Sequence, residues 1–322
     1  LLGPDDRLTL QTAGNLAVDL RMLGRYEDAL DRDLQTMSAT LNAFGPRDVA
    51  YLLAVSNVAR DFYALGRYQD ALDRQLAALP THEEVRGRNH PHVLLARRTV
   101  VMCLRKLGRT QEAVNEGRPL MVAFRNRLGD RHPDTLLVMQ SLMNAVRDNS
   151  VQASDLDEAV EIGERALDGY ERAFPDHPFK QICLANLAIV YRHRGRSKAR
   201  AANEAALRRL REIFGADHPY ALCAATNLAN GLAGAGELER AREMSADILE
   251  KSRRRRGPNQ PYTLICALNH SIDLLETGDP RGEAAWLEAF AAMHRALGDG
   301  HPEVKFAQDR KRIDCDIEAP PT

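Results

Sequence analysis

The side chains in this chain best suited to chemistry are polar residues that recur about every 42 residues. The recurring position holds Asn15, Asn57, Thr99, Ser141, Asn186, Asn227 and Asn269. An asparagine amide donates and accepts hydrogen bonds at once, so a row of such side chains could bind the backbone of an extended peptide. Each side chain could equally bond a neighbouring helix and set the spacing of the repeats. The sequence leaves both interpretations open.

Basic residues accompany this polar row in the middle of the chain, although Lys plus Arg (44) and Asp plus Glu (45) nearly balance, for a net charge of −1. Arginine forks suit carboxylates, so the row predicts a partner segment that is acidic or ends in a free carboxylate. The alternative is a solvated basic face without a ligand. The predicted peptide-binding set is Asn15, Asn57, Arg60, Arg98, Arg105, Lys106, Asn144, Arg147, Asn186, Arg192, Asn227 and Asn269.

Two further basic stretches indicate less. Arg253–Arg256 ends a predicted helix, where cations complement the helix dipole. The stretch 192–211 is rich in arginine but lacks the interleaved aromatic residues of a single-strand binding platform. The neutral overall charge also argues against a nucleic-acid coat or a membrane-surface protein.

Motifs for catalysis are absent from the sequence: there is no phosphate loop, no His-Glu-x-x-His and no Gly-x-Ser-x-Gly. The glycines of 231–236 follow a predicted helix rather than a strand. The histidines of the His-Pro pairs recur once per unit, which favours helix capping over a metal site. The five cysteines include no Cys-x-x-Cys, and Cys183 and Cys266 occupy equivalent positions typical of packing. We therefore expect no enzyme, no cofactor and no bound metal.

The elements that must position these residues repeat with the same period. Leu23–Leu30 recurs as 65–72 and, more loosely, as 107–114. Units begin near residues 3, 45, 87, 129, 174, 215, 257 and 298, most of them at a glycine that suits a helix end, with His-Pro often following at a helix start. A second glycine marks a turn within most units. Small residues let the paired helices approach, at Ala29, Ala71, Ala113, Ala159, Ala199, Ala241 and Ala284.

This pattern, with Gly-Arg-Tyr-x-x-Ala at a fixed distance from Asn-Leu-Ala, resembles the tetratricopeptide repeat family, in the 42-residue form of kinesin light chains. The resemblance implies an all-α, right-handed superhelix of about seven helix pairs with a C-terminal capping helix. We expect the array over residues 1–312, with the capping helix over 298–312 and a tail over 313–322. Repeat four departs from the pattern through an insertion at 148–155. Val101 and Met143 replace small residues, which predicts looser packing there.

The family implies a non-catalytic scaffold that binds a protein or peptide. The repeats also resemble those of actinobacterial NB-ARC/STAND-type regulators, so the alternative is the sensor arm of a signal-transduction NTPase. The start at Leu1 rather than Met fits that alternative and predicts a fragment of a longer chain. The ending 312–318 resembles the tetratricopeptide protein of the FxSxx-COOH systems, which would fit a groove for a peptide carboxylate. No apolar run reaches the ~20 residues of a membrane span, and we expect a cytoplasmic protein. The oligomeric state stays open, and so does whether the chain's own tail fills the groove, for which Asp314, Asp316 and Glu318 are acidic enough to compete.

Overall fold

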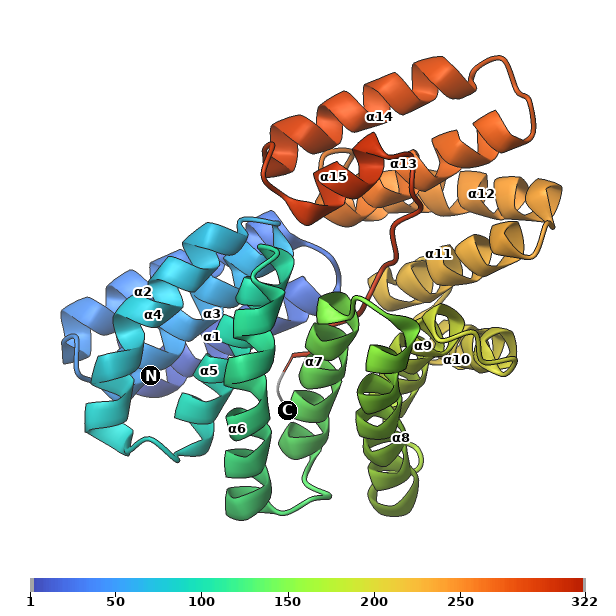
Figure 1. Cartoon of the computed structure of the whole chain (residues 1–322). Helices are drawn as coiled ribbons and strands as arrows, with labels where there is room; N and C mark the ends of the chain where they lie inside the picture. Colours follow the sequence, from blue (N-terminus) through green and yellow to red (C-terminus); the bar gives the residue numbers. More distant parts are fainter. Residues whose placement is uncertain (1–2, 321–322) are drawn as a thin grey trace. The chain divides into compact units, whose positions relative to one another are not determined.

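Paired helices follow one another along the computed structural model, which describes residues 3–320 (Figure 1). Within these residues there are fifteen α-helices, one 3-10 turn and no strand, so the predicted all-α class and helix-pair organisation are confirmed. The parts of the predicted start and tail that fall on Leu1, Leu2, Pro321 and Thr322 lie outside the described residues.

The chain divides into two units that we describe separately. Unit 1 is Leu1–Val138 and unit 2 is Met139–Thr322. Unit 1 contains α1 (Arg7–Met22), α2 (Tyr26–Phe44), α3 (Val49–Ala64), α4 (Tyr68–Arg86), α5 (Pro91–Lys106) and α6 (Thr110–Leu128). Helix α7 (Pro133–Asn149) begins in unit 1 and continues into unit 2.

Unit 2 continues with the pairs that carry the recurring asparagines. Its elements after α7 are η1 (Ala153–Asp155), α8 (Leu156–Ala173), α9 (Pro178–His193), α10 (Ala199–Phe214), α11 (Pro219–Gly234), α12 (Leu238–Arg256), α13 (Pro261–Glu276), α14 (Gly282–Leu297) and α15 (Pro302–Gln308).

Most helices pack mainly on the helices before and after them in the sequence. The first helix of a pair is covered by neighbours on most sides, and α5, α9, α11 and α13 are buried along most of their length. The second helix buries one stripe, as α10 and α12 do. Ala29, Ala71, Ala113, Ala159 and Ala241 are fully buried, as the small-residue pattern predicts. Neither helix of a pair could bury its apolar surface alone.

Helices end at the predicted glycines and begin at the predicted His-Pro pairs. The glycines that end α2, α4, α6, α10, α12 and α14 have φ between 80° and 92°. At Gly215 ψ is 159°, which places the residue in a region used almost only by glycine. The His-Pro histidines cap the next helix: His218, for example, accepts a hydrogen bond at Nδ1 from the Tyr220 amide at 3.1 Å. The histidines therefore have a structural use in every such unit.

Repeat four replaces the turn glycine by a capped insertion. The Asp155 carboxylate accepts hydrogen bonds from the amides of Val151 and Gln152 at 3.0 and 2.9 Å, and α8 starts directly after it. Met143 does not loosen the packing here, because it faces Gly163 of α8. A Cβ at Gly163 would lie 2.5 Å from the Met143 sulfur, so the glycine makes room for the larger side chain.

Two sequence expectations need correction. The C-terminal helix covers only Pro302–Gln308 instead of 298–312, because Gly298 and the cap at His301 delay its start and Arg310, with φ of 54°, turns the chain away. Ala284 is exposed, and the close approach in this pair occurs at Gly282. There an added Cβ would lie 2.9 Å from the backbone nitrogen of Leu275.

The glycine ends of the helices give a first prediction. Gly215→Ala should lower the free energy of unfolding by about 1–3 kcal/mol, because alanine is strained at positive φ. No atom lies within 4 Å of the added Cβ, so the cost would come from the backbone alone. Gly234→Ala is the matched control: it lies inside α11 with equally open surroundings, and it should be neutral or stabilising by up to ~1 kcal/mol. Urea unfolding of both variants measures this, and equal effects would contradict it.

Candidate functional site

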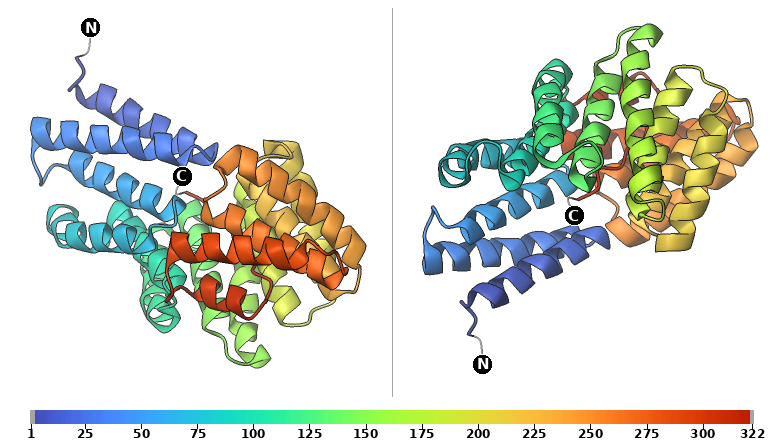
Figure 2. Two further views of the ribbon diagram at one scale, coloured as in Figure 1. Left: turned by 90° about the horizontal axis from the view of Figure 1, so that it is seen from above. Right: turned by 90° about the horizontal axis from the view of Figure 1, so that it is seen from below.

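The C-terminal segment of unit 2 lies in an extended conformation against helices of the same unit. After α15 the chain has no helical structure over 311–320, and it passes along α13, α11 and α9 (Figure 1). Figure 2 shows this segment, in dark red, from two further directions. We call residues 313–320 the tail and the side chains that contact it the tail-binding face.

Three recurring asparagines hold the tail backbone, each through both ends of its amide. The Asn269 side chain accepts from the amide of Ile313 at 3.0 Å and donates to its carbonyl at 2.8 Å. Asn227 makes the same pair of bonds with Cys315, both at 2.8 Å. Asn186 bonds the amide of Ile317 at 2.9 Å and its carbonyl at 2.8 Å. This is the donor-and-acceptor geometry that the asparagine row suggests.

The register of these bonds is regular. Successive asparagines contact every second tail residue, and the tail runs against the order of the repeats. Because alternate side chains of an extended chain point to opposite sides, one set of tail side chains faces the helices. Ile313, Cys315, Ile317 and Ala319 are all buried. The face therefore holds the backbone and covers this set of side chains, and Asp316 of the other set is buried as well.

The acidic side chains of the tail meet polar and basic partners. Asp314 pairs with Arg192, accepts a hydrogen bond from Asn230 at 3.0 Å and lies 2.8 Å from Nε2 of His193. Burial alone would raise the pKa of Asp314, but the charge of Arg192 and the contact with His193 hold that pKa well below its ordinary value. The ionised carboxylate is therefore part of the contact.

Helix α7 supplies the partners at the far end of the tail. The Glu318 carboxylate accepts hydrogen bonds from Ser141 at 2.9 Å and from Asn144 at 3.1 Å. Arg147 lies 4.0 Å from the Asp316 carboxylate. The Tyr262 hydroxyl of α13 donates to the Asp316 carbonyl at 3.1 Å. Carboxylates at three tail positions are thus matched by side chains of unit 2.

The entry of the tail is fixed by an ion pair. Arg312 lies 2.7 Å from the buried carboxylate of Asp273 and 2.5 Å from that of Glu276, both on α13. This contact sets the chain at the start of the tail, so that Ile313 meets Asn269.

The predicted residues of unit 1 lie in a different setting. Asn57 accepts a hydrogen bond from Arg60 at 2.9 Å. Burial, with the nearby charges of Arg21 and Arg98, lowers the pKa of Arg60 to about 10. These three arginines come from α1, α3 and α5 and lie near enough for their charges to act on one another. Two buried carboxylates, Asp33 and Asp61, pair with Arg21 and offset part of its charge.

The remaining predicted residues are placed without an assigned role. Asn15 is exposed on α1. Arg98, Arg105 and Lys106 are buried on α5. Their use in binding stays a prediction.

Residues outside the predicted set also contact the tail or Arg312, which precedes it. Among them are Ser141, His193, Asn230, Tyr262 and Asp273. The first three share the helix face of the recurring asparagines, and this was a signal that could have identified them. Tyr262 and Asp273 carry no such signal, because the periodic pattern does not mark their positions.

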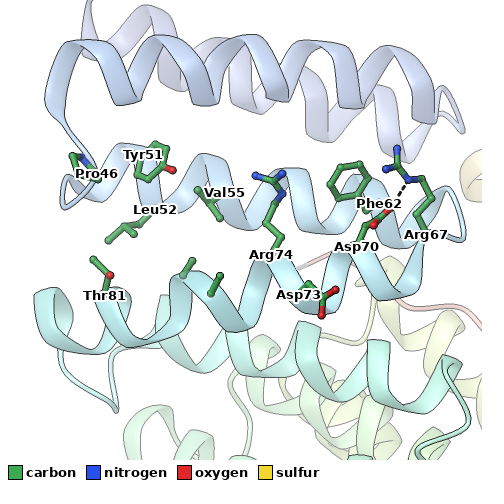
Figure 3. A pocket seen from close by; sticks show the side chains of 12 residues that line it. Pro46, Tyr51, Leu52, Val55, Phe62, Arg67, Asp70, Asp73, Arg74 and Thr81 are labelled. Atoms are coloured by element: carbon green, nitrogen blue, oxygen red, sulfur yellow. Dashed lines mark hydrogen bonds and ion pairs between the residues drawn. The ribbon is translucent and has the colours of Figure 1, made fainter.

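Unit 1 also contains a pocket of about 580 Å³ between α3 and α4 (Figure 3). Phe62 forms part of its wall, and the guanidinium of Arg67 lies 4.3 Å from the centre of that ring. Asp70 pairs with Arg67 at 2.6 Å. This ion pair lies within the pocket, whereas Asp73 and Arg74, which also line it, bond Gln69 and Met37. None of the residues that line it belongs to the predicted set.

The chain is similar to a known protein family. Two family models, both described as tetratricopeptide repeat, match residues 49–118 and 181–250, and residues 9–49 and 151–179. Together these segments cover more than half of the chain. A comparison with curated proteins finds no match. None of the helices within residues 3–320 is long and apolar enough to cross a membrane.

Similar solved structures share the fold. A Podosopora anserina protein described as a kinesin light chain with nearly identical TPR-like repeats has a TM-score of 0.51 and 20% identity, over 66% of this chain and 98% of that one. A Rap protein complexed with Competence and Sporulation Factor has a TM-score of 0.57 and 10% identity, over 94% and 98%. NprR in complex with its cognate peptide NprX has 0.58 and 12%, over 92% and 89%. At these identities the likeness establishes the fold alone.

The asparagine bonds give a second prediction. Asn227→Ala should weaken tail docking by about 2 kcal/mol, because the variant leaves the amide and carbonyl of Cys315 without these partners. Hydrogen exchange of the tail amides should then be roughly 30-fold faster. Asn15→Ala, at the equivalent exposed position of the first repeat, is the control and should leave tail exchange unchanged. Equal exchange in the two variants would show that the hydrogen bonds of Asn227 do not contribute to the free energy of tail docking.

The carboxylates of unit 1 give a third prediction. Burial and the neighbouring Asp33 raise the pKa of Asp61 to about 8, against the opposing charge of Arg21. At a pH between the ordinary pKa of an aspartate and about 8, the folded chain therefore keeps a proton on Asp61 that the unfolded chain has released. The free energy of unfolding should therefore fall with rising pH, by about 1 kcal/mol per unit between pH 6.5 and 8.

Denaturant unfolding of the whole chain at several pH values measures this slope. Circular dichroism should follow it, because the only tryptophan, Trp286, lies in unit 2. The ordinary histidine pKa lies at the lower edge of this window, so the slope is read from its upper part. There His92, whose pKa partial burial lowers to about 4, is neutral in both states. Asp61→Asn should flatten the slope. A flat slope in the wild type would show that the folded chain does not hold this proton on Asp61.

Proposed function

Because the chain belongs to the tetratricopeptide repeat family, we propose that it is a non-catalytic scaffold that binds an extended, acidic peptide segment on the tail-binding face of unit 2. The observation that carries this proposal is the occupant of that face. The chain's own tail is held through its backbone by Asn186, Asn227 and Asn269 and through its carboxylates by neighbouring side chains.

The contacts favour a ligand class rather than one sequence. Backbone bonds from asparagine are independent of the side chains of the ligand, so any extended segment can make them. The partners of Asp314 and Glu318 add a preference for acidic side chains at two even-numbered tail positions. Small or aliphatic side chains fit the buried positions between them. NprR, which shares the fold, was solved in complex with a peptide, and this supports the use of such a scaffold for peptides.

A segment that ends in a free carboxylate is a finer form of the same proposal. The carboxylates that contact unit 2 in this structure belong to side chains within the tail. Internal acidic residues are therefore the stronger candidates for recognition. The C-terminal carboxylate of a ligand is separated from them by comparing free and amidated peptides.

The sensor arm of a signal-transduction NTPase stays a prediction from the sequence. It requires a nucleotide-binding module upstream of Leu1, which a longer sequence would reveal. Binding of a peptide on unit 2 is compatible with that role, because a sensor arm also needs a ligand.

The test uses the full chain with its tail displaced. The double variant Asp314→Arg/Ile317→Asp changes only tail residues, and it should free the face by reversing one ion pair and burying a charge. A synthetic peptide of residues 311–320 should then bind with micromolar affinity by calorimetry, and more weakly at higher salt because ion pairs are screened.

Peptide and protein controls separate the parts of this proposal. Replacing the acids of the peptide at 314, 316 and 318 by amides should weaken binding at least ten-fold, whereas amidating its C-terminus should change little. Arg192→Glu in the same background should weaken binding of the acidic peptide. If neither the acidic peptide nor its side-chain amide variant binds the opened chain, or if these two bind equally, the acidic-peptide function is wrong.

A further inference from the structure

Three cysteine thiols meet where the tail crosses unit 2. Cys223 precedes Asn227 by four residues on α11, and Cys266 precedes Asn269 by three residues on α13, so both share the helix face that holds the tail. Cys315 is the tail residue whose backbone Asn227 binds. Its thiol forms hydrogen bonds with the thiols of Cys223 and Cys266. All three residues are buried.

Polar groups around the face thiols favour their ionised form. The Arg256 guanidinium lies 3.3 Å from the Cys223 sulfur. The hydroxyls of Thr226 and Ser252 lie 3.5 and 3.6 Å from the Cys266 sulfur. Hydrogen bonds from Cys315 and Thr226, with the charge of Arg256, lower the pKa of Cys266 to about 6. Thiolate character is what makes a cysteine reactive.

The two remaining cysteines lack these features. Burial raises the pKa of the Cys183 thiol to about 12, and its sulfur contacts the Gly163 carbonyl at 3.8 Å. Burial also raises the pKa of Cys103 well above its usual value. Cys183 therefore matches the packing role expected from the sequence, whereas the equivalent Cys266 has polar partners as well. The chain thus provides its own matched controls.

A metal does not explain the cluster. Among the residues that the structure describes, no group of three or more His, Cys, Asp and Glu side chains has an arrangement that could hold a metal ion. Thiols in contact can instead form a bond between two sulfur atoms.

We propose that Cys315 forms a reversible disulfide with Cys223 or Cys266, and that this bond locks the tail onto the tail-binding face. The oxidant is a peroxide. The bond itself does not depend on the proposed peptide function, because it needs only the tail and the face of the same chain. Its consequence would be a face closed to any other occupant until a thiol reductant reopens it.

The reaction takes place in two balanced steps. A face thiolate attacks a peroxide oxygen, which forms an S–O bond, breaks the O–O bond and releases hydroxide, leaving a sulfenic acid. Burial and the face thiols raise the pKa of Cys315 well above its ordinary value, so its thiol then attacks that sulfur while it loses its proton, which forms the S–S bond and expels hydroxide. The protons lost by the two thiols convert both hydroxides to water. Two thiols are oxidised by two electrons, and one hydrogen peroxide is reduced to two waters.

Access to the oxidant comes from undocking of the tail. The docked tail covers the face thiols and buries Cys315. Residues 313–320 of the tail lack secondary structure, so the tail can leave the face without unfolding a helix. Undocking would expose the thiols to peroxide, and redocking would return Cys315 to the oxidised sulfur.

The test treats the full chain with hydrogen peroxide, alkylates the remaining thiols in denaturant and maps the tryptic peptides by mass. We expect three alkylated cysteines instead of five, and a peptide containing Cys315 linked to one containing Cys223 or Cys266. Hydrogen exchange of the tail amides should slow at least ten-fold after oxidation and recover with dithiothreitol. Cys183→Ser should behave like the wild type.

Two sets of variants approach the bond from opposite sides, so that a folding defect in one does not decide the result. Cys315→Ser and Cys223→Ser/Cys266→Ser should each abolish the link and the slowed exchange. Five alkylated cysteines in the oxidised wild type would overturn the proposal, as would a link that omits Cys315. A correct link without slower tail exchange would overturn the locking of the tail.

Discussion

The structure of unit 2 depends on a match between two spacings. Successive helix pairs place one asparagine amide at each repeat, and an extended chain places an amide and a carbonyl on the same side at every second residue. Because helical backbone groups are already bonded within their helix, they cannot satisfy a buried strand that lies across them. The side chains of Asn186, Asn227 and Asn269 supply the missing partners. A strand with one residue more or less between contacts would leave buried backbone groups without bonds.

This match also explains how the face discriminates among side chains. Once the backbone register is fixed, alternate residues must point toward the helices, and there Ile313, Cys315 and Ile317 are buried. The residues between them meet charge and hydrogen-bond donors, as Asp314 does at Arg192. A neutral residue at that position would leave the guanidinium less well paired, and a basic one would repel it. In the proposed function the acids therefore provide the specificity, while the asparagines set the position.

The sequence predicts the fold and the polar row because both repeat. Glycines at helix ends, His-Pro starts and asparagine inside helices are local signals that recur in each unit, and each has a physical reason that does not depend on distant residues. The occupant could not be predicted in this way. Cys315 contacts Asn227 across 88 residues, and nothing in the periodic pattern marks the tail as its partner. Nor does residue type alone decide the outcome, since Asn15 is exposed and Asn57 bonds Arg60, although both occupy the recurring position.

A tail attached to the chain that binds it changes what any other ligand must achieve. The tail starts three residues after the turn at Arg310, so its effective concentration at the face is on the order of millimolar or higher. A free peptide that makes the same contacts competes with that concentration, and its apparent affinity falls by the ratio of the effective concentration to the dissociation constant of the tail. A segment from a partner must therefore make better acidic contacts, bind a second surface, or arrive when the tail is displaced. A disulfide at Cys315 would prevent displacement of the tail until the bond is reduced. The redox state of the thiols would then control whether another segment can bind the face.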